Sequence, residues 1–282
     1  MSTHRTAVVT IARGRHEHLR GQAWGLRRQS RPADLHVVVS MGDPEVVTVA
    51  REVLPGVHTS FMDAIGADLP LASARNVGAA VALEAGADRL VFLDVDCIPA
   101  EGTVARYDEV LQGVSARPFP VVVCGEVAYL PPADHPADYR RPGLCDLADP
   151  HPARPRLAPR EVAEDGDVRL FWSLSFGVTA DHWRRLGGFS EDYTGYGAED
   201  TDFGQRLAAA GGSLVWTGGA AAYHQHHPTS SPPTQHLHSI VNNANVFRDI
   251  WGWFPMQGWL DGFAELGLAR MDPSSGRWVV SH

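Results

Sequence analysis

The sequence predicts an α/β fold in which a mostly parallel central sheet is flanked by helices on both faces. Short apolar runs alternate with segments of helical pattern at spacings of about 20 to 30 residues. An apolar fraction of 44% over 282 residues is enough to build one substantial core. Two polar turns, 13–15 and 94–96, directly follow apolar runs. Such turns are expected at the carboxyl ends of strands, where sheets of this kind bind ligands.

The first half of the chain carries the clearest alternation of strand and helix patterns. Apolar runs predict strands at Thr6–Ile11, Leu35–Ser40 and Arg89–Leu93. Helical patterns follow the turn at 13–15 as far as Gln29, and recur at Val46–Val53 and Ser73–Ala85. Gly86 ends the last of these helices, because glycine readily adopts the left-handed conformation that closes a helix.

The second half predicts a strand at Val121–Val127 and then a long surface loop or lid at 131–167, which is rich in proline, charge and histidine. Regular structure resumes at Leu170–Val178, and a helix begins near Ala180. A further helix is expected at Glu199–Ala210, where acidic residues in the first turn suit the helix dipole. After Pro233 we expect one helix, an aromatic-rich stretch at 251–259 and a short end.

Charge and cysteine content exclude several classes of protein. A formal net charge of −9 offers no broad cationic surface for nucleic acid or anionic lipid. The sequence has no apolar run of about 18 residues, and Met1–Thr10 lacks the pattern of a signal peptide, so a cytoplasmic location without a transmembrane segment is expected. Cys97, Cys124 and Cys145 are odd in number and lack a CxxC spacing, which favours buried thiols.

The first candidate site is Asp94-Val95-Asp96, at the end of an apolar strand. Carboxylates in this position suit Mg²⁺ or Mn²⁺ bound to a diphosphate. Solvated acids at a strand-end turn are the alternative interpretation.

The second candidate site runs from Gly195 to Asp202, where a glycine-rich approach leads into a helix start that carries Glu199, Asp200 and Asp202. One of these carboxylates can act as a general base toward an acceptor hydroxyl. The alternative is an acidic helix start that is stabilised by the helix dipole alone.

The third candidate site is the histidine-rich segment from Tyr223 to Pro228. In an extended chain His224 and His226 share one face, and His227 lies on the other. Imidazole beside carboxylates favours Mn²⁺ over Mg²⁺. A polar loop without function and a store for zinc or nickel both remain open.

These motifs, taken in order, resemble the GT-A glycosyltransferases, especially family 2 and the beta-1,4-galactosyltransferases, from about Ala7 to Pro228. The matching pieces are Arg13–Leu19, Ala74–Gly78, Asp94–Pro99, Gly187–Phe189, Gly195–Asp202 and the histidine segment. The resemblance implies a single GT-A domain. Its parts are a Rossmann-like nucleotide-sugar-binding half (1–128), a variable loop or lid (129–169), a catalytic and acceptor half (170–235) and a C-terminal helical extension (236–282).

The resemblance also implies a role for each matching residue. Asp200 would be the catalytic base. Asp96 with His224 or His226 would bind Mn²⁺ or Mg²⁺. The residues implied in nucleotide-sugar binding are Arg13, Arg15, Arg75, Asn76 and Asp94, although helix packing also explains Arg75 and Asn76. The residues implied in contacts with the acceptor or donor sugar are Trp172, Tyr196, Gly197, Glu199 and Asp202.

The implied activity is inverting, metal-dependent transfer of a hexose or N-acetylhexosamine from a UDP-sugar to an acceptor hydroxyl. The acceptor is left open among sugars, glycolipids and small molecules. The segment 171–174 lacks the glycines of relatives that use galactose, which argues against that donor. The alternatives are a nucleotidyltransferase and a non-catalytic sugar-binding protein. Aromatic residues at Trp251, Trp253, Phe254 and Trp259 would serve the latter as a stacking platform, or would form core or a homodimer contact.

Overall fold

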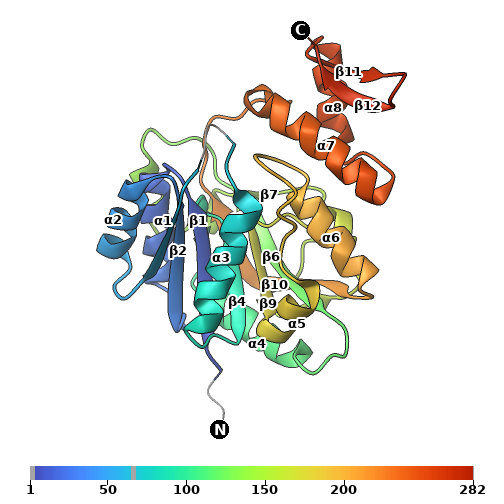
Figure 1. Ribbon diagram of the computed structural model, residues 1–282. Coiled ribbons are helices and arrows are strands. Elements are labelled where there is room, and N and C mark those ends of the chain that lie inside the picture. Colours follow the sequence, from blue (N-terminus) through green and yellow to red (C-terminus); the bar gives the residue numbers. More distant parts are fainter. Residues whose placement is uncertain (1–3, 65–67, 282) are drawn as a thin grey trace.

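A computed structural model of the chain describes residues 4–64 and 68–281. It has one large open sheet with helices on both faces, and a smaller C-terminal part at one end (Figure 1). Met1–Thr3, which belong to the segment considered for a signal peptide, lie outside the described residues. Within those residues, no helix has both the length and the apolar character needed to cross a membrane.

The first half of the chain forms a parallel arrangement of strands in the order β3-β2-β1-β4. The strands are β1 (Thr6–Ala12), β2 (Leu35–Met41), β3 (His58–Met62) and β4 (Arg89–Leu93). The helices are α1 (His16–Leu26), α2 (Pro44–Val53) and α3 (Leu71–Glu84). The predicted elements are confirmed to within about three residues at each end, and β3, a half-exposed edge strand, is an addition to them.

Beyond β4 the sheet is mixed, and here the prediction of a mostly parallel sheet needs refinement. The order continues β4-β9-β6-β10-β5. These strands are β5 (Cys97–Pro99), β6 (Val121–Tyr129), β9 (Ser175–Thr179) and β10 (Ser213–His224). β9 runs antiparallel to both β4 and β6, and β6 is parallel to β10. The strands β1, β4, β6 and β10 therefore point the same way and share one carboxyl edge.

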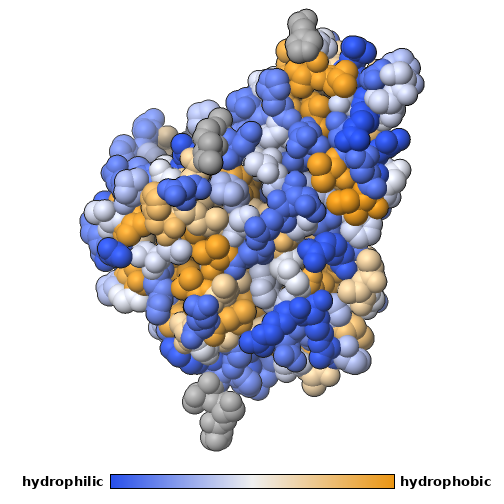
Figure 2. Space-filling view, viewed as in Figure 1, coloured by the Kyte–Doolittle hydropathy of each residue, from blue (hydrophilic) through white to orange (hydrophobic). Residues whose placement is uncertain are grey.

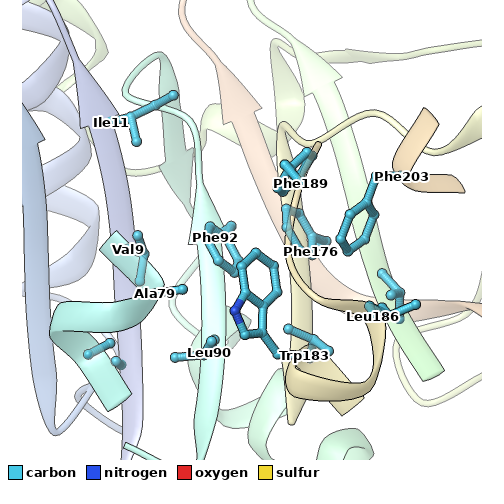
Figure 3. Packing of buried hydrophobic residues seen from close by; sticks show 14 of the residues in the cluster. Val9, Ile11, Ala79, Leu90, Phe92, Phe176, Trp183, Leu186, Phe189 and Phe203 are labelled. Carbon is cyan, nitrogen blue, oxygen red and sulfur yellow. The ribbon is translucent and has the colours of Figure 1, made fainter. Parts of the chain in front are cut away.

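Successive side chains along each strand point to opposite faces of the sheet, and they form a separate hydrophobic core on each face. One face carries α1, α2 and α4 (Thr103–Val114), and the other carries α3, α5 (Ala180–Leu186) and α6 (Glu199–Ala209). Figure 3 shows the aromatic centre of the second core. Phe92 stacks on Phe176 at 4.5 Å, and Phe189 stacks on Phe203 at 4.4 Å between ring centroids. This packing fixes α6 against the sheet near the end of β4.

The region 129–169 contains only short elements, as expected for a long surface loop. They are η1 (Pro136–Tyr139), η2 (Leu144–Asp146), β7 (Asp149–Pro150), β8 (Val162–Ala163) and, just beyond the loop, η3 (Val168–Leu170). Arg154 anchors the loop, because its guanidinium lies 4.5 Å from the ring centroid of Trp172 and 5.2 Å from that of Trp216. Such cation–π contacts hold the loop against the sheet.

The C-terminal part contains more structure than the predicted helical extension. It comprises η4 (Thr234–His236), α7 (Leu237–Trp251), α8 (Gln257–Glu265) and a hairpin of β11 (Ala269–Asp272) and β12 (Arg277–Val280). A small core of its own includes Ile240, Phe263 and Trp278. Figure 2 shows hydrophobic surface on this part of the molecule. The exposed apolar side chains of the C-terminal part include Leu266 and Met271. The extension is therefore a helix pair with a hairpin.

Candidate active site

A carboxylate and two imidazoles converge at the carboxyl edge of the sheet. Asp96 follows β4, His224 ends β10, and His227 lies three residues further on. A ligand atom from each of the three lies within 4.8 Å of the other two. One Asp96 oxygen, Oδ2, lies 3.5 Å from His227 Nε2. These three residues form the candidate metal centre of the described chain.

The grouping of His226 with Asp96 needs correction, because His227 takes that place. The alternation assumed in the sequence analysis stops when β10 ends at His224. Gln225 then turns inward, is fully buried, and donates its backbone N–H to the Asp96 carbonyl at 2.7 Å. His226 is left exposed, and His227 comes back toward the carboxylate.

The donor set fits a divalent cation. Burial lowers the pKa of His224 to about 4, so its imidazole is neutral at pH 7 and keeps a lone pair for a metal. Asp96 Oδ1 is buried and has no hydrogen-bond partner in the part of the chain that the structure describes. A buried acceptor without a partner is costly, and a bound cation would remove that cost.

Two further basic side chains from the start of α1 approach the same carboxylate. Arg15 Nε and His18 Nε2 each lie 3.8 Å from Asp96 Oδ1. Arg15 adopts the left-handed conformation with φ 56° directly before α1, which turns the chain at the end of β1. Arg13, in the same turn, is exposed. His18 was not singled out by sequence reasoning, because a lone histidine in a helix gives no sign of what it faces.

A buried arginine joins the other acidic residues of the site. Arg75, on α3, is 5% exposed and lies 3.6 Å from Asp94, 3.3 Å from Glu199 and 3.9 Å from Asp200. Burial raises the pKa of Asp94 to about 7, although Arg75 opposes this rise. Burial, with the neighbouring Asp200, also raises the pKa of Glu199. One guanidinium therefore balances three carboxylates from two elements.

The two oxygens of Asp200 have different surroundings, because one accepts a hydrogen bond and the other faces Arg75 at 3.9 Å. The backbone N–H of Ser173 donates to Oδ2 at 3.0 Å. Oδ1 is buried and, within the described ranges 4–64 and 68–281, accepts no hydrogen bond. A carboxylate with one oxygen that accepts no hydrogen bond has the capacity to accept a proton from a bound hydroxyl.

The glycine-rich segment before α6 is held in a strained shape. Gly195 and Gly197 have φ of 77° and 99°, and Ala198 adopts φ 74°, which is unfavourable for a residue with a Cβ. Asn243 of α7 supports this segment, because its side-chain amide donates to the carbonyls of Thr194 and Gly197 at 3.0 and 2.9 Å. The loop thereby carries Tyr196 at the surface, 40% exposed.

Tyr196 lies within a group of stacked rings. Its ring is 4.6 Å from that of His236 and 5.9 Å from that of Trp259, both stacked. His236 and Trp259 come from η4 and α8, so the C-terminal part contributes to this surface. Of the four aromatic residues suggested as a platform, Trp259 lies here. Trp251 instead donates its ring N–H to Asp202 at 2.9 Å.

Some predicted site residues have structural contacts that account for them. Asp202 is 1% exposed and accepts hydrogen bonds from Trp251 and Tyr193, so it anchors α7 to α6 and does not reach an acceptor. Asn76 exchanges hydrogen bonds with the backbone of Phe189, both at 2.9 Å, which ties α3 to the loop after α5. Trp172 stacks on Arg154 and borders the loop at 129–169.

The metal-suited cluster and the Asp200 carboxylate lie at the carboxyl edge of an α/β sheet, the place where open sheets of this kind bind their ligands. Residues 161–228 match the family model described as the N-terminal domain of galactosyltransferase. The chain is also 30% identical over 210 residues to validoxylamine A glucosyltransferase of Streptomyces hygroscopicus subsp. limoneus, which is 66% of this chain and 43% of that protein. The protein of the same name from S. hygroscopicus subsp. jinggangensis is 32% identical over 160 residues, 50% of this chain and 36% of that one.

Solved structures agree with these matches. S. aureus TarS 1–349 superposes with a TM-score of 0.55 at 13% identity, which covers 86% of this chain and 65% of TarS. The same fragment in complex with UDP gives 0.54 at 14% identity with the same coverage. The chain spans less than half the length of the two validoxylamine A glucosyltransferases that it matches. The comparisons confirm both the predicted resemblance to GT-A glycosyltransferases and the α/β fold.

Proposed function

We propose that the chain is a metal-dependent glycosyltransferase that moves a hexose or N-acetylhexosamine from a UDP-sugar to an acceptor hydroxyl, with inversion at the anomeric carbon. The observation that supports this most strongly is the pairing of two features at one edge of the sheet. They are the Asp96, His224 and His227 cluster and the Asp200 carboxylate, whose Oδ1 accepts no hydrogen bond from the residues that the structure describes.

The transfer is a single displacement. The acceptor oxygen bonds to the anomeric carbon as the bond from that carbon to the diphosphate oxygen breaks, and attack from the opposite side inverts the configuration. The hydroxyl proton passes to Asp200 Oδ1, while the Ser173 N–H holds Oδ2. Arg15 and Arg13, at the end of β1, offer positive charge to the departing diphosphate.

A divalent cation at Asp96, His224 and His227 would neutralise charge on the diphosphate as it leaves. Mixed nitrogen and oxygen ligands favour Mn²⁺ over Mg²⁺. Arg75 keeps the Asp94, Glu199 and Asp200 carboxylates close together despite their like charge.

Glucose is the first donor sugar to test. Both curated relatives are named as glucosyltransferases, and the segment 171–174 lacks the glycines expected with galactose. A UDP complex of a structural neighbour favours UDP as the nucleotide. The stacked rings at Tyr196 present a flat apolar face, which suits the C–H face of a sugar or cyclitol acceptor.

The experiment that tests this function is depletion of a panel of UDP- and GDP-sugars by the purified protein, with Mn²⁺ or with EDTA, followed by mass spectrometry. We expect release of UDP from one sugar, dependent on Mn²⁺ and lost in Asp96→Ala. Asp181→Asn, an exposed change on α5, is the matched control and should behave as the parent protein.

Other outcomes would favour the alternatives. Binding of a nucleotide sugar with no turnover under any metal condition would indicate a sugar- or nucleotide-sugar-binding protein. Release of pyrophosphate from a nucleoside triphosphate and a sugar phosphate would indicate a nucleotidyltransferase.

A further inference from the structure

The imidazole of His18 is a buried group that the proposed transfer does not use. It lies in the first turn of α1 and is 8% exposed. Its Nε2 has no hydrogen-bond partner among residues 4–64 and 68–281. It faces Asp96 Oδ1 at 3.8 Å, and that oxygen is likewise buried and unpartnered. Two buried polar atoms therefore face each other, and neither makes a hydrogen bond with the other.

A neutral imidazole carries one N–H and one lone pair, so the His18 ring can present its Nε2 toward Asp96 as a lone pair.

A lone pair on His18 Nε2 and one on Asp96 Oδ1 would repel each other in this buried site unless a cation lay between them. At 3.8 Å the two atoms are too far apart for one shared hydrogen bond. Arg15 Nε is equally 3.8 Å from Asp96 Oδ1, beyond hydrogen-bond range, so it does not satisfy that oxygen either. A divalent cation held by both atoms would satisfy them.

The position of His18 is built into the fold. Gln225, fully buried, donates its side-chain amide to the His18 carbonyl at 3.0 Å and its backbone N–H to the Asp96 carbonyl at 2.7 Å. Gly21, one turn further along α1, makes room for Gln225, because a Cβ there would lie 2.4 Å from its Oε1. Gln225, through its side chain and its backbone, thus links α1 and the turn after β4 to the histidine segment.

His18 and His227 approach Asp96 from different sides. His18 Nε2 faces Oδ1, and His227 Nε2 lies 3.5 Å from Oδ2. The two rings are 6.4 Å apart and nearly perpendicular. With His224 beside His227 at 5.4 Å between ring centroids, three imidazoles surround one carboxylate.

We propose that His18 Nε2, which stands outside the three ligand atoms that lie within 4.8 Å of one another, moves toward them and becomes a fourth protein ligand of the divalent cation at Asp96. The site then offers one carboxylate and three imidazoles, a set that selects Mn²⁺, Co²⁺ or Zn²⁺ over Mg²⁺. This inference rests on the metal site of the proposed function.

The test is metal binding by the full chain without donor or acceptor. Mn²⁺ affinity is measured by electron paramagnetic resonance, competition by Mg²⁺ is measured in the same titration, and Co²⁺ is followed by visible absorption. The proteins are the parent chain, His18→Gln, Asp96→Ala and His238→Gln, an exposed histidine of α7 that serves as the matched control. Pulsed resonance on bound Mn²⁺ counts the coupled imidazole nitrogens.

We expect His18→Gln to bind Mn²⁺ about 10- to 100-fold more weakly, as for other changes that disturb metal coordination. Its preference for Mn²⁺ over Mg²⁺ should shrink, its Co²⁺ spectrum should shift, and the imidazole count should fall from three to two. The His238→Gln protein should match the parent in every measurement. Melting without metal establishes that each variant is folded.

The failures are distinguishable. If the parent chain and Asp96→Ala bind Mn²⁺ equally, or neither binds it, the metal site fails and the His18 ligand with it. If the parent binds through Asp96 but His18→Gln keeps its affinity and spectra, the His18 ligand alone is wrong. If His18→Gln does not fold, the same measurements on His18→Asn and the imidazole count in the parent chain test the proposal instead. A count of two imidazoles in the parent chain overturns it.

Discussion

At the scale of single residues, the site depends on carboxylates whose surroundings differ although their sequence positions are adjacent. Asp200 accepts one backbone hydrogen bond through Oδ2, and its Oδ1 accepts none from the described residues. Asp202, two positions along α6, points about 200° away around the helix and is held by two ring donors. Glu199 pairs with buried Arg75. Three acids in one helical turn therefore have three separate tasks.

Asp200→Asn tests the proposed base directly. The amide cannot accept the acceptor proton, so we expect kcat to fall about 10²- to 10⁴-fold. Binding of UDP should stay within about threefold, because no donor contact is removed. Turnover is followed by UDP release, and UDP affinity by calorimetry. Near-normal turnover would remove Asp200 from this role, and loss of UDP affinity would make it a structural residue.

The position of a candidate site residue could be predicted from the sequence only where the backbone follows a regular helix or strand pattern. Asp96, His224 and Asp200 stand at strand and helix ends, and the structure brings Asp96 and His224 together as expected. His227 was assigned to the wrong face because alternation was extended past the end of β10. His18 and Gln225 act through contacts between segments about 200 residues apart, which no local pattern reveals.

At the scale of elements, α7 supports the loop before α6 from outside the predicted catalytic half. Asn243, fully buried, binds both ends of the segment that carries Tyr196. Gly197 also packs tightly against the start of α8, since a Cβ there would lie 2.8 Å from Met256 Sδ. The C-terminal elements therefore shape the loop before α6.

Asn243→Ala should loosen that loop. The change removes two part-buried hydrogen bonds, to the carbonyls of Thr194 and Gly197, each worth about 0.5 to 1.5 kcal/mol, so we expect a loss of about 1 to 3 kcal/mol in the free energy of unfolding. The acceptor KM should rise more than kcat falls, because Tyr196 is displaced and Asp200 is not. Urea denaturation and steady-state kinetics measure the two effects. Asn242→Ala, the exposed neighbour on α7, is the control.

The elements themselves were predictable where helix and strand alternate, and less so where they do not. β1, β2, β4 and α6 follow plain apolar or amphipathic patterns. The antiparallel course of β9 depends on which neighbours it joins, and a strand pattern does not encode direction. β10 was missed because Gly218 and Gly219 interrupt its apolar run, where the register with β6 also shifts.

At the scale of the whole molecule, Arg75 joins the two halves of the chain across the site. It extends from α3 in the first half to Glu199 and Asp200 at the start of α6 in the second. Its neighbours Asn76 and Ser73 also contact the segment between α5 and α6, through Phe189 and Glu191. The packing of the two halves therefore places the buried Arg75 guanidinium among carboxylates, and the stability of the fold depends on this balance of charge.

Arg75→Met should destabilise the metal-free protein by about 3 to 5 kcal/mol at pH 8, because buried carboxylates lose their counter-charge. The loss should be smaller at pH 5.5. Burial already holds the pKa of Glu199 above its ordinary value of 4.5, so the folded protein takes up this proton more readily than the unfolded chain. The free energy of unfolding that Glu199 contributes through this proton is fully present below about pH 4.5 and is lost as the pH rises.

Without Arg75, which opposes that shift, the pKa of Glu199 rises further and the stability loss extends to higher pH. The difference between variant and parent must therefore grow from pH 5.5 to pH 8. Urea denaturation in EDTA at both pH values measures it, with Arg185→Met, a surface arginine on α5, as the control. An equal loss at both pH values would mean that Arg75 acts through packing, and an unchanged stability would mean that the carboxylates do not need it.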